Sequence, residues 1–179
     1  MAQALLIVDY QNDFNPGGAL AVPGGDEIAG RLNELAGSGD YDLVVATRDW
    51  HPPDHGSFAE HGGPWPVHCV AGTPGAELHP ALDDARVDVV LDKGTDPQTE
   101  GYSGFQGTRL AELLHERGID RVTVVGLATD YCVKNTALEA LREGFGVTVD
   151  STAVRGVDVQ PGDSERALEE LRAAGAAIA

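Results

Sequence analysis

The chain has 179 residues, of which 42% are hydrophobic and 23% are charged, as in an ordinary folded domain and unlike a disordered or fibrous chain. Its 12 basic and 29 acidic residues give a formal net charge of −17, which argues against binding to nucleic acid or to anionic membranes. The apolar runs are too short for a transmembrane helix. We therefore expect one domain over residues 1–179 with neither kind of partner.

The N-terminal stretch and the cysteines indicate a cytoplasmic protein. "MAQALLIVDYQNDF" has no basic region before its apolar run, so it does not resemble a secretory signal. Two cysteines without an export signal fit a reducing compartment, where a disulfide is not expected. The sequence is compatible with a homo-oligomer and leaves the oligomeric state open.

Strands and helices are predicted to alternate along the chain. The apolar runs and helical spacings predict strands at 4–9, 41–49, 87–94, 120–128 and 145–153, and helices at 24–39, 107–119, 132–144 and within 163–179. The last helix is expected to be capped by Asp163 or Ser164 and to be followed by a short strand. Residues 50–86 are rich in Pro, Gly and His and form no predicted element, and an irregular segment of that length often carries function.

This pattern predicts an α/β protein with three α/β/α layers and a mainly parallel central sheet, because each strand is an almost continuous apolar run. Ligands of such sheets bind beyond the carboxyl ends of the strands. Five polar or reactive residues lie at or just after these predicted ends: Asp9, Asp49, His51, Lys93 and Cys132. Their arrival at one edge of the sheet predicts a single site.

Cys132 is a candidate nucleophile at the start of a predicted helix. Unpaired N–H groups and the helix dipole there would favour a thiolate by roughly 0.3–2 kcal/mol, and Lys93 would add a positive charge. No histidine adjoins Cys132, so Asp9 is the expected general base. Taken alone, each residue has an ordinary structural interpretation, since free cysteine is commonly buried. Cys69 is assigned no chemistry.

A candidate metal site lies between residues 49 and 68. Asp49 and His51 are two positions apart on an extended segment and should therefore point to the same side. One more histidine, His55 or His68, would complete a face of two histidines and one carboxylate that suits zinc, iron or manganese. The spacing is not a fixed metal signature, and hydrogen-bonded histidines are the common alternative. Three further histidines lack such a partner: His61, His79 and His115.

Five blocks of the chain together resemble the nicotinamidases of the isochorismatase-like cysteine hydrolase superfamily. In order, they are "LLIVDYQNDF", "TRDWHPPDHGSF", "WPVHCVAGTPGAELHP", "DKGTDPQTEGYSGF" and "VVGLATDYCVKNTALEAL", and the likeness extends from about residue 4 to 155. The resemblance implies a Rossmann-like fold and a catalytic triad of Asp9, Lys93 and Cys132. The oxyanion would be held by the N–H groups of Ala128 and Cys132, after a cis peptide bond between Leu127 and Ala128.

The resemblance also implies a divalent metal ion held by Asp49, His51 and His68. His55 matches a position that ligates metal in some members and not in others, so its role stays open. The block that carries these residues separates nicotinamidases from relatives without metal, such as isochorismatases and carbamoyl-amide hydrolases. The identity of the metal is left open among zinc, iron and manganese.

The implied substrate is nicotinamide, a small molecule whose ring would be enclosed by Phe14, Trp65 and Tyr102. The implied reaction is hydrolysis to nicotinic acid and ammonia through a thioester, as in NAD salvage, with pyrazinamide as a further substrate. Tyr131 departs from the histidine found before the nucleophile in some branches. Three alternatives remain: a related hydrolase of another small amide, a mononuclear metallohydrolase in which Cys132 is structural, and an inactive binding or assembly protein of the same fold. The complete set of triad and metal residues argues against the third.

Overall fold

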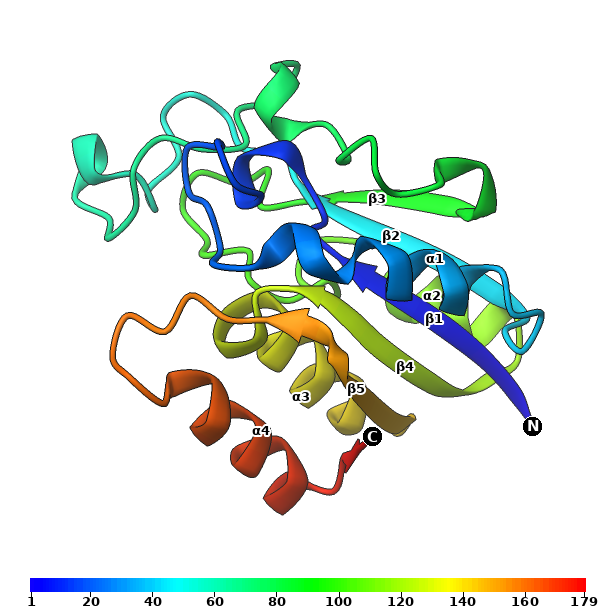
Figure 1. Ribbon diagram of the computed structural model, residues 1–179. Helices are drawn as coiled ribbons and strands as arrows, with labels where there is room; N and C mark the ends of the chain where they lie inside the picture. Colours follow the sequence, from blue (N-terminus) through cyan, green and yellow to red (C-terminus); the bar gives the residue numbers. More distant parts are fainter.

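A six-stranded sheet, with every strand parallel to its neighbours, forms the centre of the computed structural model, which describes residues 1–179 (Figure 1). The strand order is β3-β2-β1-β4-β5-β6. The strands are β1 (Ala2–Val8), β2 (Leu43–Asp49), β3 (Val89–Lys93), β4 (Ile119–Leu127), β5 (Gly146–Arg155) and β6 (Ala177–Ile178). The helices are α1 (Ala29–Ala36), α2 (Leu110–Glu116), α3 (Lys134–Arg142) and α4 (Asp163–Ala174). The predicted α/β fold with a parallel sheet is confirmed.

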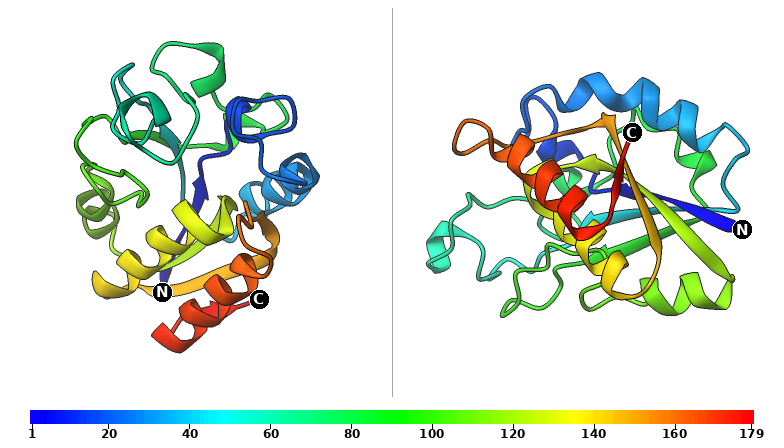
Figure 2. Two further views of the ribbon diagram at one scale, coloured as in Figure 1. Left: turned by 90° about the vertical axis from the view of Figure 1, so that its left-hand side faces the viewer. Right: turned by 90° about the horizontal axis from the view of Figure 1, so that it is seen from below.

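Both faces of the sheet are covered, because alternate residues of each strand point to opposite sides. Leu6 of β1 belongs to one buried cluster, which includes residues of α2 and α3 and Leu171 of α4. Leu5 of β1 belongs to a second cluster on the other face, together with Leu32 of α1. Because each face of the sheet packs into one of these clusters, the strands are apolar throughout. The clusters lie between the sheet and the helices on either side, which gives the three layers visible in Figure 2.

Two helices begin differently from the prediction. A π-helical turn, Thr129–Val133, precedes α3, so Cys132 lies inside this turn and not at the first position of the helix. The predicted caps of α4 are wrong: its N-cap is Gly162, with φ of 85°, and no side chain at that position caps the helix. Asp158, in the loop before the helix, bonds to its first turn instead: its carboxylate accepts from Ser164 N–H at 2.7 Å and from Ser164 Oγ–H at 2.9 Å.

The connection between β2 and β3 is largely irregular, as predicted, with short 3₁₀ turns at Ala59–His61, Pro74–Ala76 and Asp84–Arg86. Its first part extends beyond the carboxyl ends of the strands (Figure 1). Isolated bridges pair His51 with Val70 and Phe58 with Trp65, which fold this part of the connection back over the sheet edge. None of the helices combines the length and the apolar character needed to cross a bilayer.

Candidate active site

Asp9 is held in a tight turn at the carboxyl end of β1. Its backbone has φ of 48°, and its N–H donates to the carbonyl of Thr47 at 3.0 Å. The Thr47 hydroxyl donates to Asp9 Oδ1 at 2.8 Å. These contacts occupy one carboxylate oxygen and fix the side chain, and they leave Oδ2 facing the centre of the site.

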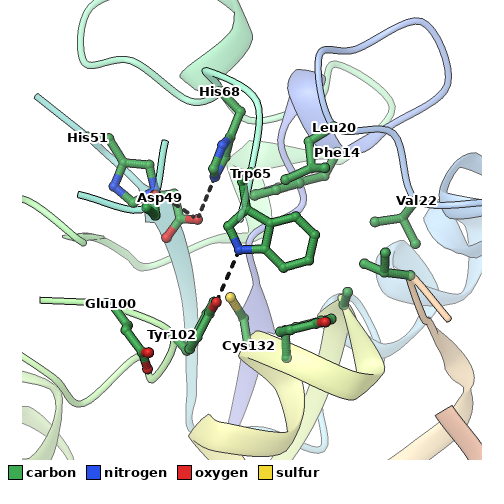
Figure 3. A pocket seen from close by; sticks show the side chains of 14 residues that line it. Phe14, Leu20, Val22, Asp49, His51, Trp65, His68, Glu100, Tyr102 and Cys132 are labelled. Carbon is green, nitrogen blue, oxygen red and sulfur yellow. Dashed lines mark hydrogen bonds and ion pairs between the residues drawn. The ribbon is translucent and has the colours of Figure 1, made fainter. Parts of the chain in front are cut away.

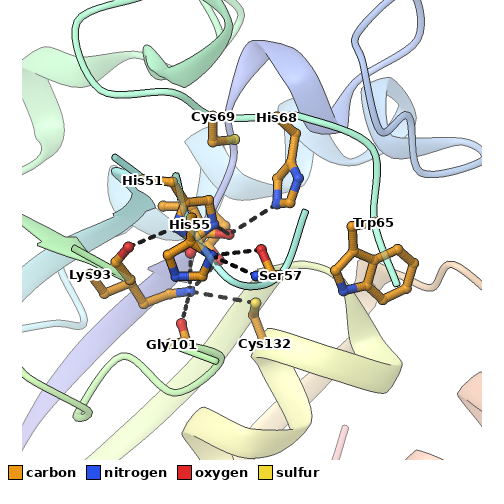
Figure 4. Close-up of polar contacts among 12 residues, drawn as sticks. His51, His55, Ser57, Trp65, His68, Cys69, Lys93, Gly101 and Cys132 are labelled. Carbon is orange, nitrogen blue, oxygen red and sulfur yellow. Dashed lines mark hydrogen bonds and ion pairs between the residues drawn. The ribbon is translucent and has the colours of Figure 1, made fainter. Parts of the chain in front are cut away.

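Lys93, at the end of β3, is the centre of the polar cluster (Figure 4). Its ammonium donates to Asp49 Oδ1 at 2.6 Å, to the Gly101 carbonyl at 2.8 Å and to Cys132 Sγ at 3.5 Å. Asp9 Oδ2 lies 2.8 Å from the same ammonium as an ion pair. The Cys132 thiol is also a hydrogen-bond donor to the Asp9 carboxylate, so this carboxylate is placed to accept the thiol proton.

The charges in this cluster are buried and strongly coupled. Burial raises the pKa of Asp9 to about 6, with Lys93 opposing the shift and Asp49 adding to it. Burial also disfavours the charge on Asp49, but Lys93 and His51 outweigh it and hold the pKa of that carboxyl below its ordinary value. Burial acts against the Lys93 ammonium too, yet Asp49 and Asp9 raise its pKa well above the ordinary value. Asp9 can therefore be either protonated or ionised near neutral pH, next to the Lys93 ammonium, which stays charged.

Cys132 lies buried in the π-helical turn before α3, and its Sγ is within 4.8 Å of a carboxylate oxygen of Asp9. Burial raises the pKa of its thiol well above the ordinary value, Lys93 opposes the shift, and Asp9 and Asp49 add to it. Any help that the start of the helix gives the thiolate is outweighed here by two nearby carboxylates and the loss of solvent. The resting thiol is protonated and requires a base.

Backbone amides surround the space next to Cys132. The peptide bond between Leu127 and Ala128 is cis, as the resemblance implied. The Ala128 carbonyl accepts from Tyr131 N–H and Val133 N–H, both at 3.1 Å, while the Ala128 N–H donates to no protein acceptor. Ala128 and Cys132 both line the pocket described below. A free N–H beside the sulfur is the kind of group that can hold a developing oxyanion.

Asp49, His51 and His68 form the second cluster, with one ligand atom from each lying within 4.8 Å of the others. Asp49 Oδ2 is 3.4 Å from His51 Nε2 and 3.9 Å from His68 Nε2. Nδ1 of His51 is 2.7 Å from the Gly94 carbonyl oxygen, and Nδ1 of His68 is 2.8 Å from the Pro66 carbonyl oxygen. A carbonyl can only accept, so both rings donate from Nδ1 and direct Nε2 toward Asp49, where a deprotonated Nε2 can bind a cation.

This geometry fits a divalent cation, since two neutral imidazoles and one carboxylate oxygen converge on one point. Gly94 is required for it: at φ of 62°, an added Cβ would lie 2.5 Å from Cε1 of His51. Asp49 belongs to both clusters, because Oδ1 contacts Lys93 and Oδ2 faces the histidines. The sequence placed Asp49 only among the metal ligands, and the structure adds its contact with the lysine.

His55 lies next to this cluster but outside it. Its ring stacks on His51 with centroids 3.9 Å apart, its Nδ1 is 2.7 Å from Ser57 Oγ, and its Nε2 is buried without a protein partner. The three histidines expected to be uninvolved lie elsewhere, and none belongs to a cluster that could hold a metal ion: His61, His79 and His115. Cys69 is buried as a free thiol whose pKa burial raises further.

A mostly apolar pocket opens over Cys132 (Figure 3). It is partly open to solvent, and most of the residues that line it are hydrophobic, as suits a flat apolar ring. Trp65 Nε1 donates to the Tyr102 hydroxyl at 3.1 Å, and Tyr131 packs against both rings, with centroids 4.9 Å and 5.6 Å away. Phe14 lines the same pocket. All three predicted aromatic residues therefore line one pocket, together with Cys132 and the Asp49, His51 and His68 cluster.

A model of the isochorismatase domain matches residues 3–179. The chain belongs to the isochorismatase family. It is 44% identical over 200 residues to the nicotinamidase of Escherichia coli, covering 98% of this chain and 93% of that one. It is 47% identical over 183 residues to the nicotinamidase/pyrazinamidase of Mycobacterium tuberculosis, covering 96% and 95%. The structure of the Pyrococcus horikoshii pyrazinamidase in complex with zinc has a TM-score of 0.92 and 49% identity, covering 100% of this chain and 99% of that one.

Several residues of this isochorismatase-family site escaped the sequence analysis. Thr47 is one, because a threonine inside a strand gives no signal that its hydroxyl will meet a carboxylate. Asp130 is another: its carboxylate accepts from Val157 N–H at 2.9 Å and from Asp158 N–H at 2.8 Å, and so holds Val157 in the pocket wall. The remaining pocket residues that were not predicted to line it are Leu20, Val22, Ser57, Glu100 and Tyr131.

Proposed function

We propose that this protein hydrolyses nicotinamide to nicotinic acid and ammonia through a thioester on Cys132. The single observation that carries the proposal is the set of contacts made by the Lys93 ammonium. It contacts the carboxylates of Asp9 and Asp49 and the sulfur of Cys132. The three groups lie beneath an aromatic pocket. The nicotinamidase and pyrazinamidase names of the relatives support the substrate, and pyrazinamide is the second substrate that we propose.

In the first half of the reaction, Asp9 Oδ2 takes the proton of the Cys132 thiol. The resulting thiolate, paired with Lys93, attacks the carboxamide carbon, and the carbonyl oxygen becomes an oxyanion held by the N–H groups of Ala128 and Cys132. Asp9 then gives its proton to the amide nitrogen, the C–N bond breaks, and ammonia leaves. The pKa of about 6 for Asp9 suits both transfers near neutral pH.

In the second half, Asp9 takes a proton from water, and the hydroxide attacks the thioester carbon. The C–S bond then breaks, and the departing thiolate recovers the proton from Asp9, which restores the resting site. Phe14, Trp65 and Tyr102 hold the ring flat during both halves and restrict water to the reacting face.

Asp49, His51 and His68 would hold one divalent metal ion, which supplies a Lewis-acid contact for the ring nitrogen of the substrate. Zinc is the ion we propose first, since the histidine and carboxylate set suits it and the Pyrococcus pyrazinamidase holds zinc. His55 is a candidate further ligand, because its ring stacks on that of His51 beside the cluster. We place the reaction in cytoplasmic NAD salvage.

The test is ammonia release from nicotinamide by the purified, metal-loaded protein. Cys132→Ala is expected to abolish release and to retain the metal, whereas His51→Ala is expected to lose the metal and to cut turnover. Trapping of a nicotinoyl adduct on Cys132, detected by mass spectrometry, would support the thioester. Turnover by the Cys132→Ala variant would refute it and favour attack by a metal-activated water. Hydrolysis of other small amides without any of nicotinamide would overturn the substrate.

A further inference from the structure

Strand β2 continues past the point where β1 stops being its partner. The ladder between the two strands ends at Val8 and Thr47, and Asp9 N–H adds a last bond to the Thr47 carbonyl. In a parallel ladder, the N–H and C=O of alternate residues point to the same neighbour. The backbone groups of Asp49, two residues after Thr47, therefore point to a position where β1 has already turned away.

The side chain of Gln11 fills that position. Asp49 N–H donates to Gln11 Oε1 at 2.8 Å, and Gln11 Nε2 donates to the Asp49 carbonyl at 2.8 Å. A second Nε2 bond goes to the Ala76 carbonyl at 2.8 Å. Gln11 is fully buried. Its primary amide thus substitutes for a strand residue, because it presents one acceptor and one donor, as a peptide group does.

We propose that Gln11 is a positioning residue that fixes Asp49 between Lys93 and the divalent metal ion. The inference rests on the metal site of the proposed function. Asp49 has to place Oδ1 2.6 Å from the Lys93 ammonium and Oδ2 3.4 Å from His51 Nε2 at the same time. Gln11 holds the backbone from which that carboxylate extends, on the side opposite to β3.

The same side chain connects three parts of the site. Gln11 lies two residues after Asp9 in the chain, pairs with the end of β2 and reaches the segment of Ala76. No other side chain donates to or accepts from the backbone of Asp49. Loss of the Gln11 amide would leave the N–H and C=O of Asp49 buried without partners. A small rotation of Asp49 would then prevent its carboxylate from contacting Lys93 and facing His51 at the same time.

The experiment measures zinc affinity by competition with a chromogenic chelator, using the full chain freed of metal and then titrated with zinc alone. Gln11→Glu keeps the shape but places an oxygen against the Asp49 carbonyl, and Gln11→Met keeps the length without any hydrogen bond. Both are expected to weaken zinc binding about tenfold or more, the range found when outer partners of metal ligands are removed. Asn12→Ala is the matched control, since Asn12 bonds to the neighbouring Pro74 carbonyl at 2.8 Å but not to Asp49.

Unchanged zinc affinity in both folded Gln11 variants would overturn the inference. Failure of both variants to fold in the metal-free state, seen by circular dichroism, would also overturn it in favour of a purely structural role. An equal loss of zinc affinity in Asn12→Ala would overturn it too, because the effect would then belong to the 74–76 segment. If the wild type binds zinc tightly but does not hydrolyse nicotinamide, the proposed substrate fails while the role of Gln11 is retained.

Discussion

Replacing Asp9 by Asn is expected to abolish turnover while making the folded protein more stable. The change keeps the size of the side chain and its Oδ1 acceptor for the Thr47 hydroxyl, but it removes the proton acceptor at Oδ2. Because burial keeps the thiol of Cys132 protonated, the thiolate is then scarce at pH 7. Loss of a general base typically lowers kcat by about 10²–10⁴-fold.

The gain in stability follows from the direction of the pKa shift of Asp9. Its pKa rises from 3.8 to about 6 on folding, so the neutral form favours the folded state. That favourable contribution is complete below about pH 3.8 and is lost as the pH rises through about 6. At pH 7 the ionised carboxylate lowers the free energy of unfolding by about 3 kcal/mol relative to a neutral group. Asn should recover only part of this, because its Nδ2 donor would face the Lys93 ammonium in place of Oδ2; the rise in Tm should therefore be smaller than the roughly 6–12 °C that 3 kcal/mol would give.

Ammonia release and thermal unfolding at pH 7 measure the two effects on the same preparation. Asp54→Asn is the matched control, since Asp54 is exposed, and it should change neither quantity. A kcat/KM for Asp9→Asn within tenfold of wild type would refute the role of Asp9 as base. A Tm below that of the wild type would refute the electrostatic reasoning.

Three further predictions follow from the same geometry. The kcat/KM for nicotinamide should fall about tenfold per pH unit below pH 6, because Asp9, with a pKa of about 6, must be ionised to accept the proton; a flat profile between pH 5 and 7 would contradict this. Asp130→Asn should raise KM about tenfold, equivalent to ~1.4 kcal/mol, with a smaller change in kcat, because one of the two N–H groups that hold the Val157 segment loses its acceptor; steady-state kinetics with unchanged KM would exclude this role. Removal of metal by a chelator should abolish turnover but leave Cys132 open to alkylation by iodoacetamide, since Lys93 and Asp9 do not depend on the ion for their contacts with each other; mass spectrometry of the alkylated chain decides it.

The strand ends were predictable because they follow from short-range patterns. An apolar run that stops at Asp9, Asp49 or Lys93 identifies both a buried strand and its carboxyl end, and parallel strands bring those ends together. The same reasoning could not place Gln11 or Thr47, since their partners are 38 residues away in the chain. Neither residue type signals such a contact by itself.

Other features depended on local backbone geometry that the side-chain pattern does not encode. The cap of α4 was predicted from Asp163 and Ser164, which are good capping residues, but the left-handed Gly162 starts the helix one residue earlier. Asp158 then supplies the hydrogen bonds from the preceding loop. Neighbouring capping residues differ only slightly in the free energy they contribute, so the path of the preceding loop determines the residue at which the helix begins.

By itself, the sequence determined the parallel α/β sheet and the set of chemical groups at its edge, because periodicity and residue type are local properties. Only the tertiary structure decided how those groups share contacts. It placed Asp49 between the lysine and the two histidines, and it buried Cys132 deeply enough to keep its thiol protonated. Charge coupling and burial depend on distances of a few ångströms between residues far apart in the chain, which no pattern along the chain specifies.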